Sequence, residues 1–339
     1  MVAERLTAQL LAGPPARDPV AVAERLLAIQ GQDPRGARLA IRARTAGLTV
    51  ADVDRALTED RSLVITWLNR GTLHLAGSED YPWLHALTAP PLFTTSARRL
   101  GQEGVGPDAA ERGVAVIERS LAEEGPRTRA QLRELIDAAG VRTEGQALVH
   151  LLMLASLRGL VVRGPMLGRD HAYVLVRDWL GEPAPVDRDA ALAELARRYL
   201  AGHGPADERD LARWAGLPLR DVRAGLRAIG SELHERDDGL VDLARRPPAA
   251  ELPPPRLLGS YDPLLLGWRS RAPILREDER LVTVNGLFRP FALAGGRAAA
   301  VWRIVDGKVV VEPFGRLSRT TAAALERDAE DVVRYLALA

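Results

Sequence analysis

Gln30 and Gln32 are two carboxamide side chains separated by a single glycine, in the segment Ile29-Gln30-Gly31-Gln32. A glutamine cannot act as a general base, but its amide oxygen can accept a hydrogen bond from water while its NH₂ group donates elsewhere. In an extended segment, both side chains would point to one side of the chain. The pair could then orient a water molecule. On spacing alone, the favoured interpretation is instead a solvated helix C-terminus.

A second polar group lies in the segment from Thr66 to Leu75. After Gly71 the residues alternate, with Thr72 and His74 on one face and the leucines on the other, as a half-buried strand requires. Arg70 shares the parity of Thr72 and His74. We keep two interpretations open: a ligand contact near the glutamines, or a satisfied and partly buried histidine beside a structural arginine.

Several other catalytic chemistries lack their residues. The chain has 339 residues and no cysteine, which excludes a thiol nucleophile, a disulfide framework, a thiolate zinc site and an iron–sulfur cluster. Lys308 is the single lysine among 46 basic residues, and we expect it to be solvated. No metal-ligand spacing, glycine-rich phosphate loop, Ser–His–Asp order or paired-carboxylate signature stands out. We therefore expect no metal site and no cofactor.

The glutamines follow a predicted helix within an N-terminal region, residues 1–125. The segment 19–29 has helical apolar spacing, with Asp18 as its N-cap and Pro19 at its first position. We expect this helix to end near Gln30-Gly31. With a helix over 50–57 and the strand after Gly71, the region is interpreted as a divergent winged helix that carries the glutamine pair.

Two further segments have the order helix, helix, hairpin that is typical of a winged helix. In 126–180, Thr128 caps the first helix, and a capping box of Thr143 and Gln146 is expected to start the second. In 187–246, helices over 190–201, 208–215 and 219–229 precede a hairpin turned at Asp238-Gly239. In a helix-turn-helix, the second helix enters the major groove of DNA.

The remaining sequence predicts a linker and a β domain. The proline-rich segment 245–255 is stiff and polyproline-like. Beyond it, short strands over 281–284, 288–293, 298–305 and 309–312 and a final helix over 320–336 form a domain at 256–339. The fold class is therefore predicted as α+β, with tandem winged-helix domains followed by a small C-terminal antiparallel β-barrel.

The winged helices make double-stranded DNA the expected partner. The segment 126–180 has eight arginines against five carboxylates, a net charge of +3, whereas 187–246 is near balance. Phosphate contacts supply most of the affinity for DNA; the alternative is a protein–protein module. No apolar run approaches the length of a membrane span, and the N-terminus is no signal peptide. We expect a monomer with no membrane association, in the cytoplasm with the nucleoid.

Four sequence blocks together resemble the AlkZ-like (YcaQ-related) winged-helix DNA glycosylases, over nearly the whole chain. The blocks are Ile29-Gln30-Gly31-Gln32, the segment TWLNRGTLHL from Thr66 to Leu75, the segment YDPLLLGWR from Tyr261 to Arg269, and the segment NGLFRP from Asn285 to Pro290 running on to Trp302-Arg303. Each block alone is a weak signal. Their order around two winged helices and a β tail is fairly specific.

The resemblance implies a tandem winged-helix body and a β-barrel end around duplex DNA. It also implies hydrolytic removal of N7-alkylated purines, in some members bulky adducts or interstrand crosslinks, which would give a self-resistance role. The family's catalytic motif, two glutamines spaced by one residue, maps onto Gln30 and Gln32. The intervening family residue is usually apolar or small, and Gly31 departs toward a freer backbone. The subgroup with Asp as second member is excluded, although Asp33 follows.

The glutamines suit this chemistry on physical grounds. N7-alkylguanine is cationic and departs as a neutral base, so water oriented by two amides can complete the hydrolysis at C1′. Strand-nicking lyase activity needs an amine nucleophile, usually lysine, and Lys308 is expected to be solvated. We therefore expect a monofunctional DNA glycosylase of N7-alkylated purines, which would leave an abasic site.

Eight residues are candidate contacts to DNA or to the lesion: Arg70, Thr72, His74, Arg158, Arg163, Arg169, Trp268 and Arg269. Trp268 and Arg269 could equally be a core residue and an internal ion pair, which we favour slightly. The alternative function is a non-catalytic winged-helix DNA-binding protein or transcriptional regulator, although the predicted recognition helix is poor in base-reading residues. A third alternative is a former enzyme that only binds damaged DNA.

Overall fold

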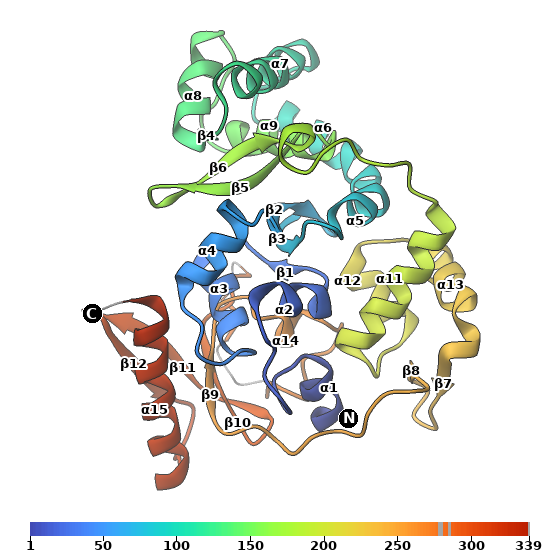
Figure 1. Cartoon of the computed structure of the whole chain (residues 1–339), viewed down its shortest axis with the longest axis vertical. Helices are drawn as coiled ribbons and strands as arrows, with labels where there is room; N and C mark the ends of the chain where they lie inside the picture. The colour runs from blue at the N-terminus through green and yellow to red at the C-terminus, as the bar shows by residue number, and fades with distance from the viewer. Residues whose placement is uncertain (277–280, 284–285, 338–339) are drawn as a thin grey trace. The chain divides into compact units, whose positions relative to one another are not determined.

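The computed structural model describes residues 1–276, 281–283 and 286–337, and divides the chain into two compact units (Figure 1). Unit 1 comprises Met1–Val53 and Leu192–Ala339, and unit 2 comprises Asp54–Ala191. The predicted strand over 281–284 and the sequence block that begins at Asn285 fall partly outside the described residues.

The strands of unit 2 form an antiparallel sheet in the order β3-β2-β5-β6-β4. Thr66 lies opposite His74 and Leu68 opposite Thr72, so these four side chains share one face of the β2–β3 hairpin. The predicted strand after Gly71 is confirmed, and so is the hairpin predicted within 126–180. The strands are β2 (Leu63–Leu68), β3 (Thr72–Gly77), β4 (Arg127–Thr128), β5 (Val161–Leu167) and β6 (Asp170–Leu175).

Side chains cap one of the predicted helices of unit 2 but not the next. Thr128 accepts from the backbone NH of Gln131, whose side chain accepts from Thr128 NH, so the predicted cap is confirmed. The predicted capping box of Thr143 is wrong, because its hydroxyl donates to Asp137 at 2.6 Å. The helices are α4 (Val50–Thr58), α5 (Tyr81–Thr88), α6 (Phe93–Gln102), α7 (Pro107–Glu124), α8 (Arg129–Ala138), α9 (Ala147–Leu157) and α10 (Val176–Trp179).

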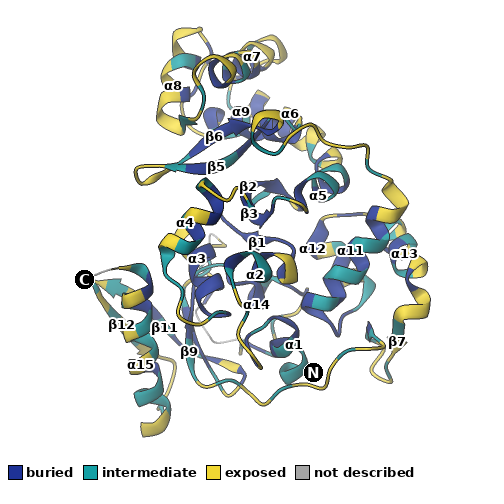
Figure 2. Ribbon diagram, in the orientation of Figure 1, coloured by how far each residue is buried: buried dark blue, intermediate teal, exposed yellow. Residues whose placement is uncertain are grey.

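Helix α9 is the centre of the main core of unit 2. Leu151 and Leu152 are fully buried and pack in one cluster with Trp67 of the sheet and Ile117 of α7. All but two of its residues are buried, and Figure 2 draws buried residues dark blue near its label. A helix that is apolar on all sides is a core helix.

The helices of unit 1 include the three that were predicted after residue 187. The predicted hairpin follows them as β7 (Leu233–Glu235) and β8 (Val241–Leu243), with Gly239 at positive φ in its turn. Helix α13 buries Val222 and Gly225 and exposes its arginines. The helices are α1 (Val2–Ala8), α2 (Pro19–Leu26), α3 (Pro34–Arg42), α11 (Arg188–His203), α12 (Glu208–Ala215), α13 (Leu219–Ala228), α14 (Pro263–Leu266) and α15 (Arg319–Leu336).

The C-terminal strands form an open sheet, so the predicted β-barrel is wrong. The order is β12-β11-β10-β9, with β9 (Arg256–Leu258), β10 (Phe291–Ala294), β11 (Arg297–Val305) and β12 (Lys308–Pro313). Helix α15 packs against β9 and β12. Trp302 of the sheet and Leu325 and Val332 of α15 share one core. Because α15 buries an apolar face of the sheet, the strands can pack without closing on themselves.

Candidate active site

A tight turn separates α2 from the glutamine pair. Leu27 has φ 62° and ψ −49°, and the NH of Ala28 donates to the carbonyl of Leu26 at 2.8 Å. This is the strained form of the γ-turn. All three residues are buried, so packing holds the strain in place. The helix therefore ends at Leu26, earlier than predicted, and Gln30 enters the short strand β1 (Ile29–Gln30).

The two glutamine side chains contact each other directly. Gln30 Nε2 donates to Gln32 Oε1 at 2.6 Å, so both amides lie on one side of Gly31. Gln30 is 7% exposed, whereas Gln32 is exposed. In the described part of the chain, Gln30 Oε1 accepts no hydrogen bond and the NH₂ of Gln32 donates none. Gln30 lies in the short strand and Gln32 at a bend just before α3. Among the described residues, the pair has one acceptor and one donor group without a partner.

The segment after the glutamines is fixed by the start of α3. Asp33 caps this helix, its Oδ1 accepting from Arg35 NH at 3.0 Å, and Pro34 occupies the first turn. A Cβ at Gly36 would lie 2.4 Å from the carbonyl oxygen of Ser260, so only glycine allows this approach. The Asp-Pro pair is a readable helix start that the sequence analysis missed.

An aromatic residue lies beside this cap. Tyr261 has φ 56° and is half-buried. Burial raises the pKa of its hydroxyl, and the carboxylate of Asp33 raises it further. The ring centroid of Tyr261 is 5.3 Å from that of Phe288, and the Arg271 guanidinium lies 4.8 Å from the Phe288 centroid. The sequence offered no sign that Asp33 and Tyr261 are neighbours, because they are far apart in the chain.

One fully buried ion pair and two partly exposed ones anchor the far end of α3. Arg44 and Asp262 are both fully buried and joined by two hydrogen bonds of 2.8 and 2.9 Å. Arg42 forms ion pairs with Asp331, at 2.9 Å, and with Asp328 of α15. Such pairs are costly to break from one side. The glutamines therefore lie between two elements whose positions are fixed by packing and by ion pairs.

His74 is a buried, neutral histidine in unit 2. It is 3% exposed, and its Nδ1 lies 2.9 Å from the carbonyl oxygen of Thr72. Burial, and secondarily the charge of Arg70, lowers the pKa of His74 to about 3. The hydroxyls of Thr66 and Thr72 have no hydrogen-bond partner among the described residues. Arg70 itself is exposed in the turn.

The three other predicted arginines of unit 2 differ in their availability. Arg158 pairs with Glu111 through two hydrogen bonds, one of 2.8 Å. Arg163 donates to the Tyr173 hydroxyl at 2.8 Å and lies over the Trp67 ring. Arg169 is exposed at the β5–β6 turn. Only Arg169 presents its charge outward without a carboxylate or aromatic partner in the described residues.

Trp268 is buried in unit 1, whereas Arg269 is exposed. Trp268 is 5% exposed, and its indole NH donates to the carbonyl of His203 at 2.9 Å. Arg5 lies 4.4 Å from its ring centroid. Arg269 pairs with Asp207 at 2.8 Å. In the structure Trp268 is a core residue, and Arg269 forms an ion pair within unit 1 although its side chain is 44% exposed.

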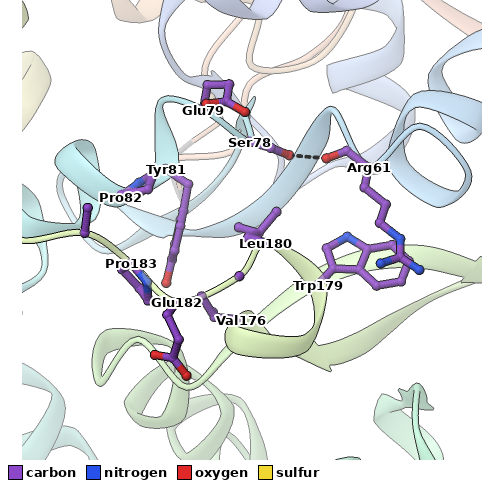
Figure 3. Close-up of a pocket in the computed structure, with 12 residues that line it drawn as sticks. Arg61, Ser78, Glu79, Tyr81, Pro82, Val176, Trp179, Leu180, Glu182 and Pro183 are labelled. Atoms are coloured by element: carbon purple, nitrogen blue, oxygen red, sulfur yellow. Dashed lines mark hydrogen bonds between the residues drawn. The ribbon is translucent and has the colours of Figure 1, made fainter.

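Unit 2 also contains a cavity of about 250 Å³ that none of the predicted residues lines (Figure 3). The Arg61 guanidinium lies 4.1 Å from the Trp179 ring centroid, and Ser78 Oγ donates to the Arg61 carbonyl at 2.5 Å. The hydroxyl of Tyr81 is buried without a partner among the described residues, and burial raises its pKa.

The described residues contain no group of three or more His, Cys, Asp or Glu side chains that could hold a metal ion. Across the same ranges, the search for a helix long and apolar enough to span a bilayer finds none.

Comparison with known proteins identifies relatives over most of the chain. The profile of the family described as "DNA glycosylase AlkZ-like" matches residues 23–335. The curated protein "Interstrand DNA cross-link repair glycosylase" of Streptomyces sahachiroi is 30% identical over 342 residues, 92% of this chain and 89% of that protein. The solved structure "Streptomyces sahachiroi DNA glycosylase AlkZ" superposes with a TM-score of 0.80 at 26% identity, covering 98% of this chain and 95% of that one.

Proposed function

Because the chain belongs to the AlkZ-like DNA glycosylase family, we propose that it is a monofunctional enzyme that hydrolyses the N-glycosidic bond of N7-alkylated purines in duplex DNA. Bulky adducts and interstrand crosslinks are included in the proposed substrates, since a relative is named for crosslink repair. The observation that carries the proposal is the 2.6 Å hydrogen bond between Gln30 and Gln32.

This hydrogen bond defines what each amide can do. Because Gln30 Nε2 is used in donating to Gln32, Gln30 Oε1 is left as the acceptor that can hold a water proton. The Gln32 NH₂ group can donate to a sugar or phosphate oxygen. Neither amide can remove a proton, so the pair orients water and does not activate it as a base.

A cationic leaving group removes the need for a general acid, which the glutamines do not provide. An N7-alkylated purine carries a positive charge on the base, and cleavage of its glycosidic bond releases a neutral base. The water attacks C1′, forms the new C–O bond and gives its proton to solvent. An undamaged purine would leave as an anion and would need a general acid, which this pair does not provide. The site therefore selects for cationic lesions through chemistry.

We propose that the chain has no strand-nicking lyase activity, because of where its single lysine lies. A lyase attacks C1′ with an amine, and Lys308 lies at the start of β12, exposed, next to the Asp306-Gly307 turn. We propose that water is the only nucleophile and that the product is an abasic site.

The fold offers elements for holding the duplex. We propose that the segments 126–180 and 187–246 act as winged helices, since each has the order of helices and hairpin that the motif requires. The exposed Arg169 at the β5–β6 turn and the exposed Arg70 are proposed phosphate contacts. Thr72 and His74 stay predictions as contacts, and the burial of His74 does not favour them.

The test compares lesions of different charge on one duplex. Duplex DNA with a single N7-methylguanine, with hypoxanthine, or with no lesion is incubated with the protein, and abasic sites are revealed by heating in alkali. Release is expected only from N7-methylguanine, and borohydride is expected to trap no covalent adduct. Release of hypoxanthine at a similar rate, or a trapped adduct, would contradict the proposed mechanism. A parallel reaction on a crosslinked duplex shows whether crosslinks are substrates.

A further inference from the structure

Unit 1 contains an open, arginine-rich pocket of about 730 Å³. It is formed by the last turn of α2, the C-terminal half of α11 and the segment after β8. Its charged lining consists of Arg25, Arg198, Arg245, Arg246 and Glu24. None of these side chains was among the residues predicted from the sequence, because they come from three separate parts of the chain.

The positive charge of this pocket is only partly neutralised. The carboxylate of Asp242 is already paired with Arg246, whose Nε donates to Oδ1 at 2.7 Å and to Oδ2 at 2.8 Å. Glu24 is the one carboxylate in the lining. Partial burial lowers the pKa of Arg25, and the charges of Arg246 and Arg198 lower it further. Like charges held this close repel one another, and an anion between them would relieve the repulsion.

Two of the arginines form a fixed frame. Arg246 donates to the carbonyls of Leu200 and Ala201 at the end of α11, the latter at 3.2 Å. Arg198 donates to the carbonyl of Glu24 at 2.7 Å. Their guanidinium groups are therefore held by backbone as well as by carboxylates, so this part of the pocket is formed in advance.

The two remaining arginines have donors to spare. Among the described residues, Arg25 makes a single long hydrogen bond, from Nη1 to the carbonyl of Ala201 at 3.4 Å. Arg245 is exposed and makes no hydrogen bond or ion pair within the part of the chain that the structure describes. Guanidinium groups present several N–H donors in a planar fork that matches the oxygens of a phosphate.

We infer that this pocket binds a backbone phosphate of the DNA duplex that carries the lesion. The position of Arg25 supports DNA as the source of the phosphate, because it lies in the last turn of α2, directly before the γ-turn and the glutamine pair. A phosphodiester held there would fix the strand relative to the element that leads into Gln30. The inference rests on the proposed function, since it takes damaged DNA as the substrate.

The test substitutes the two arginines that have spare donors. The double variant Arg25→Gln/Arg245→Gln is compared with wild type for binding to a fluorescent duplex over a series of salt concentrations. Each lost phosphate contact reduces the slope of log K against log[salt] by about 0.9, so a reduction of about 1 to 2 is expected, with affinity lowered roughly tenfold. The matched control is Arg297→Gln, an exposed arginine of β11, which should leave both quantities unchanged. Thermal unfolding verifies that each variant is folded.

Two results would overturn the inference. One is an unchanged affinity and salt slope in the double variant. The other is that inorganic phosphate raises the melting temperature of wild type but not of the variant while duplex binding is unaffected, because the pocket then takes a free anion. Binding is measured without base release, so the two proposals can fail separately. If the wild type releases no base, and the double variant still binds the duplex more weakly than the wild type, only the catalytic proposal is refuted.

Discussion

Helices α9 and α13 occupy the same place in two similar successions of helices and hairpin, yet their surroundings are opposite. Helix α9 is covered by α6 and α7, and its leucines form the core of unit 2. Helix α13 buries one narrow face, and Figure 2 shows exposed residues along it. Arg220 and Arg227 are among these exposed residues. A helix can read a groove only where a face is uncovered. The comparison therefore favours α13 as the helix available to DNA.

The same comparison reverses the expectation from net charge. The segment 126–180 has the larger positive sum, but several of its arginines are held by carboxylates. Arg158 pairs with Glu111, Arg177 with Glu118 at 3.0 Å, and Arg127 with Glu124. Charge counted along a sequence includes pairs that cancel in the folded protein. The number of unpaired, exposed arginines is the better guide to a phosphate surface.

The largest expected effect is on stability. Leu151→Ala in α9 removes a fully buried side chain, and we expect it to destabilise unit 2 by about 2–5 kcal/mol. Leu226→Ala, a half-buried leucine of α13, should cost less than about 1.5 kcal/mol. Hydrogen exchange of the amides of each unit measures both. Equal losses would show that α9 and α13 are equally buried in solution.

Acid is expected to act on both units through one buried histidine in each. Burial lowers the pKa of His74 and of His203 to about 3, below the ordinary value of about 6.5. The unfolded chain therefore binds more protons between these values. Stability is complete above pH 6.5 and falls as the pH decreases toward 3, by about 2 kcal/mol per histidine at pH 5.

Substitution separates the two contributions. His74→Gln should weaken the acid dependence of unit 2 alone, and His203→Gln that of unit 1 alone, in urea unfolding followed by hydrogen exchange at pH 7 and pH 5. In unit 2 part of the dependence should remain, because burial also lowers the pKa of His85. An unchanged pH dependence in either variant would contradict the neutral, buried state of that histidine.

The smallest effects concern the arginines. Arg227→Gln in α13 should lower duplex affinity by about fivefold and reduce the salt slope by about 1. Arg220 is left unchanged, because it already pairs with Asp221 at 3.4 Å. Arg158→Gln, whose charge is already paired with Glu111, should change affinity by less than about threefold. Binding isotherms at several salt concentrations compare the two. A larger loss from Arg158→Gln would reverse the assignment of α13 as the exposed helix.

Local signals in the sequence predicted much of the fold. The caps at Asp18 and Thr128 are confirmed because each depends only on residues three positions away. The hairpin at Asp238-Gly239 is confirmed for the same reason. The open C-terminal sheet was missed, because closure depends on whether α15 covers the strands, and no residue within a strand shows that.

The candidate site likewise has features that the sequence predicted and features that it did not. The glutamine motif was found through the family resemblance, whereas its extended conformation depends on the γ-turn at Leu27, which tertiary packing imposes against helical propensity. The nearness of Tyr261 to Asp33, and the gathering of four arginines, arise from contacts distant in sequence. Such contacts leave no local pattern.

The central claim is that Gln30 and Gln32 together orient the water that releases a cationic base. It is tested most directly by the single-turnover rate of N7-methylguanine release at saturating enzyme. Gln30→Ala and Gln32→Ala should each lower this rate by about 100-fold. The double variant should be only slightly slower than the slower of the two single variants, because the two amides act as one hydrogen-bonded unit.

The matched control is Gln102→Ala, an exposed glutamine of α6 that bonds only to Arg99, which should release base at the wild-type rate. Circular dichroism spectra of the variants verify the fold. Loss of release in the Gln30 and Gln32 variants, with Gln102→Ala unaffected, is the result the account predicts. Release at the wild-type rate by the Gln30→Ala/Gln32→Ala double variant would contradict it.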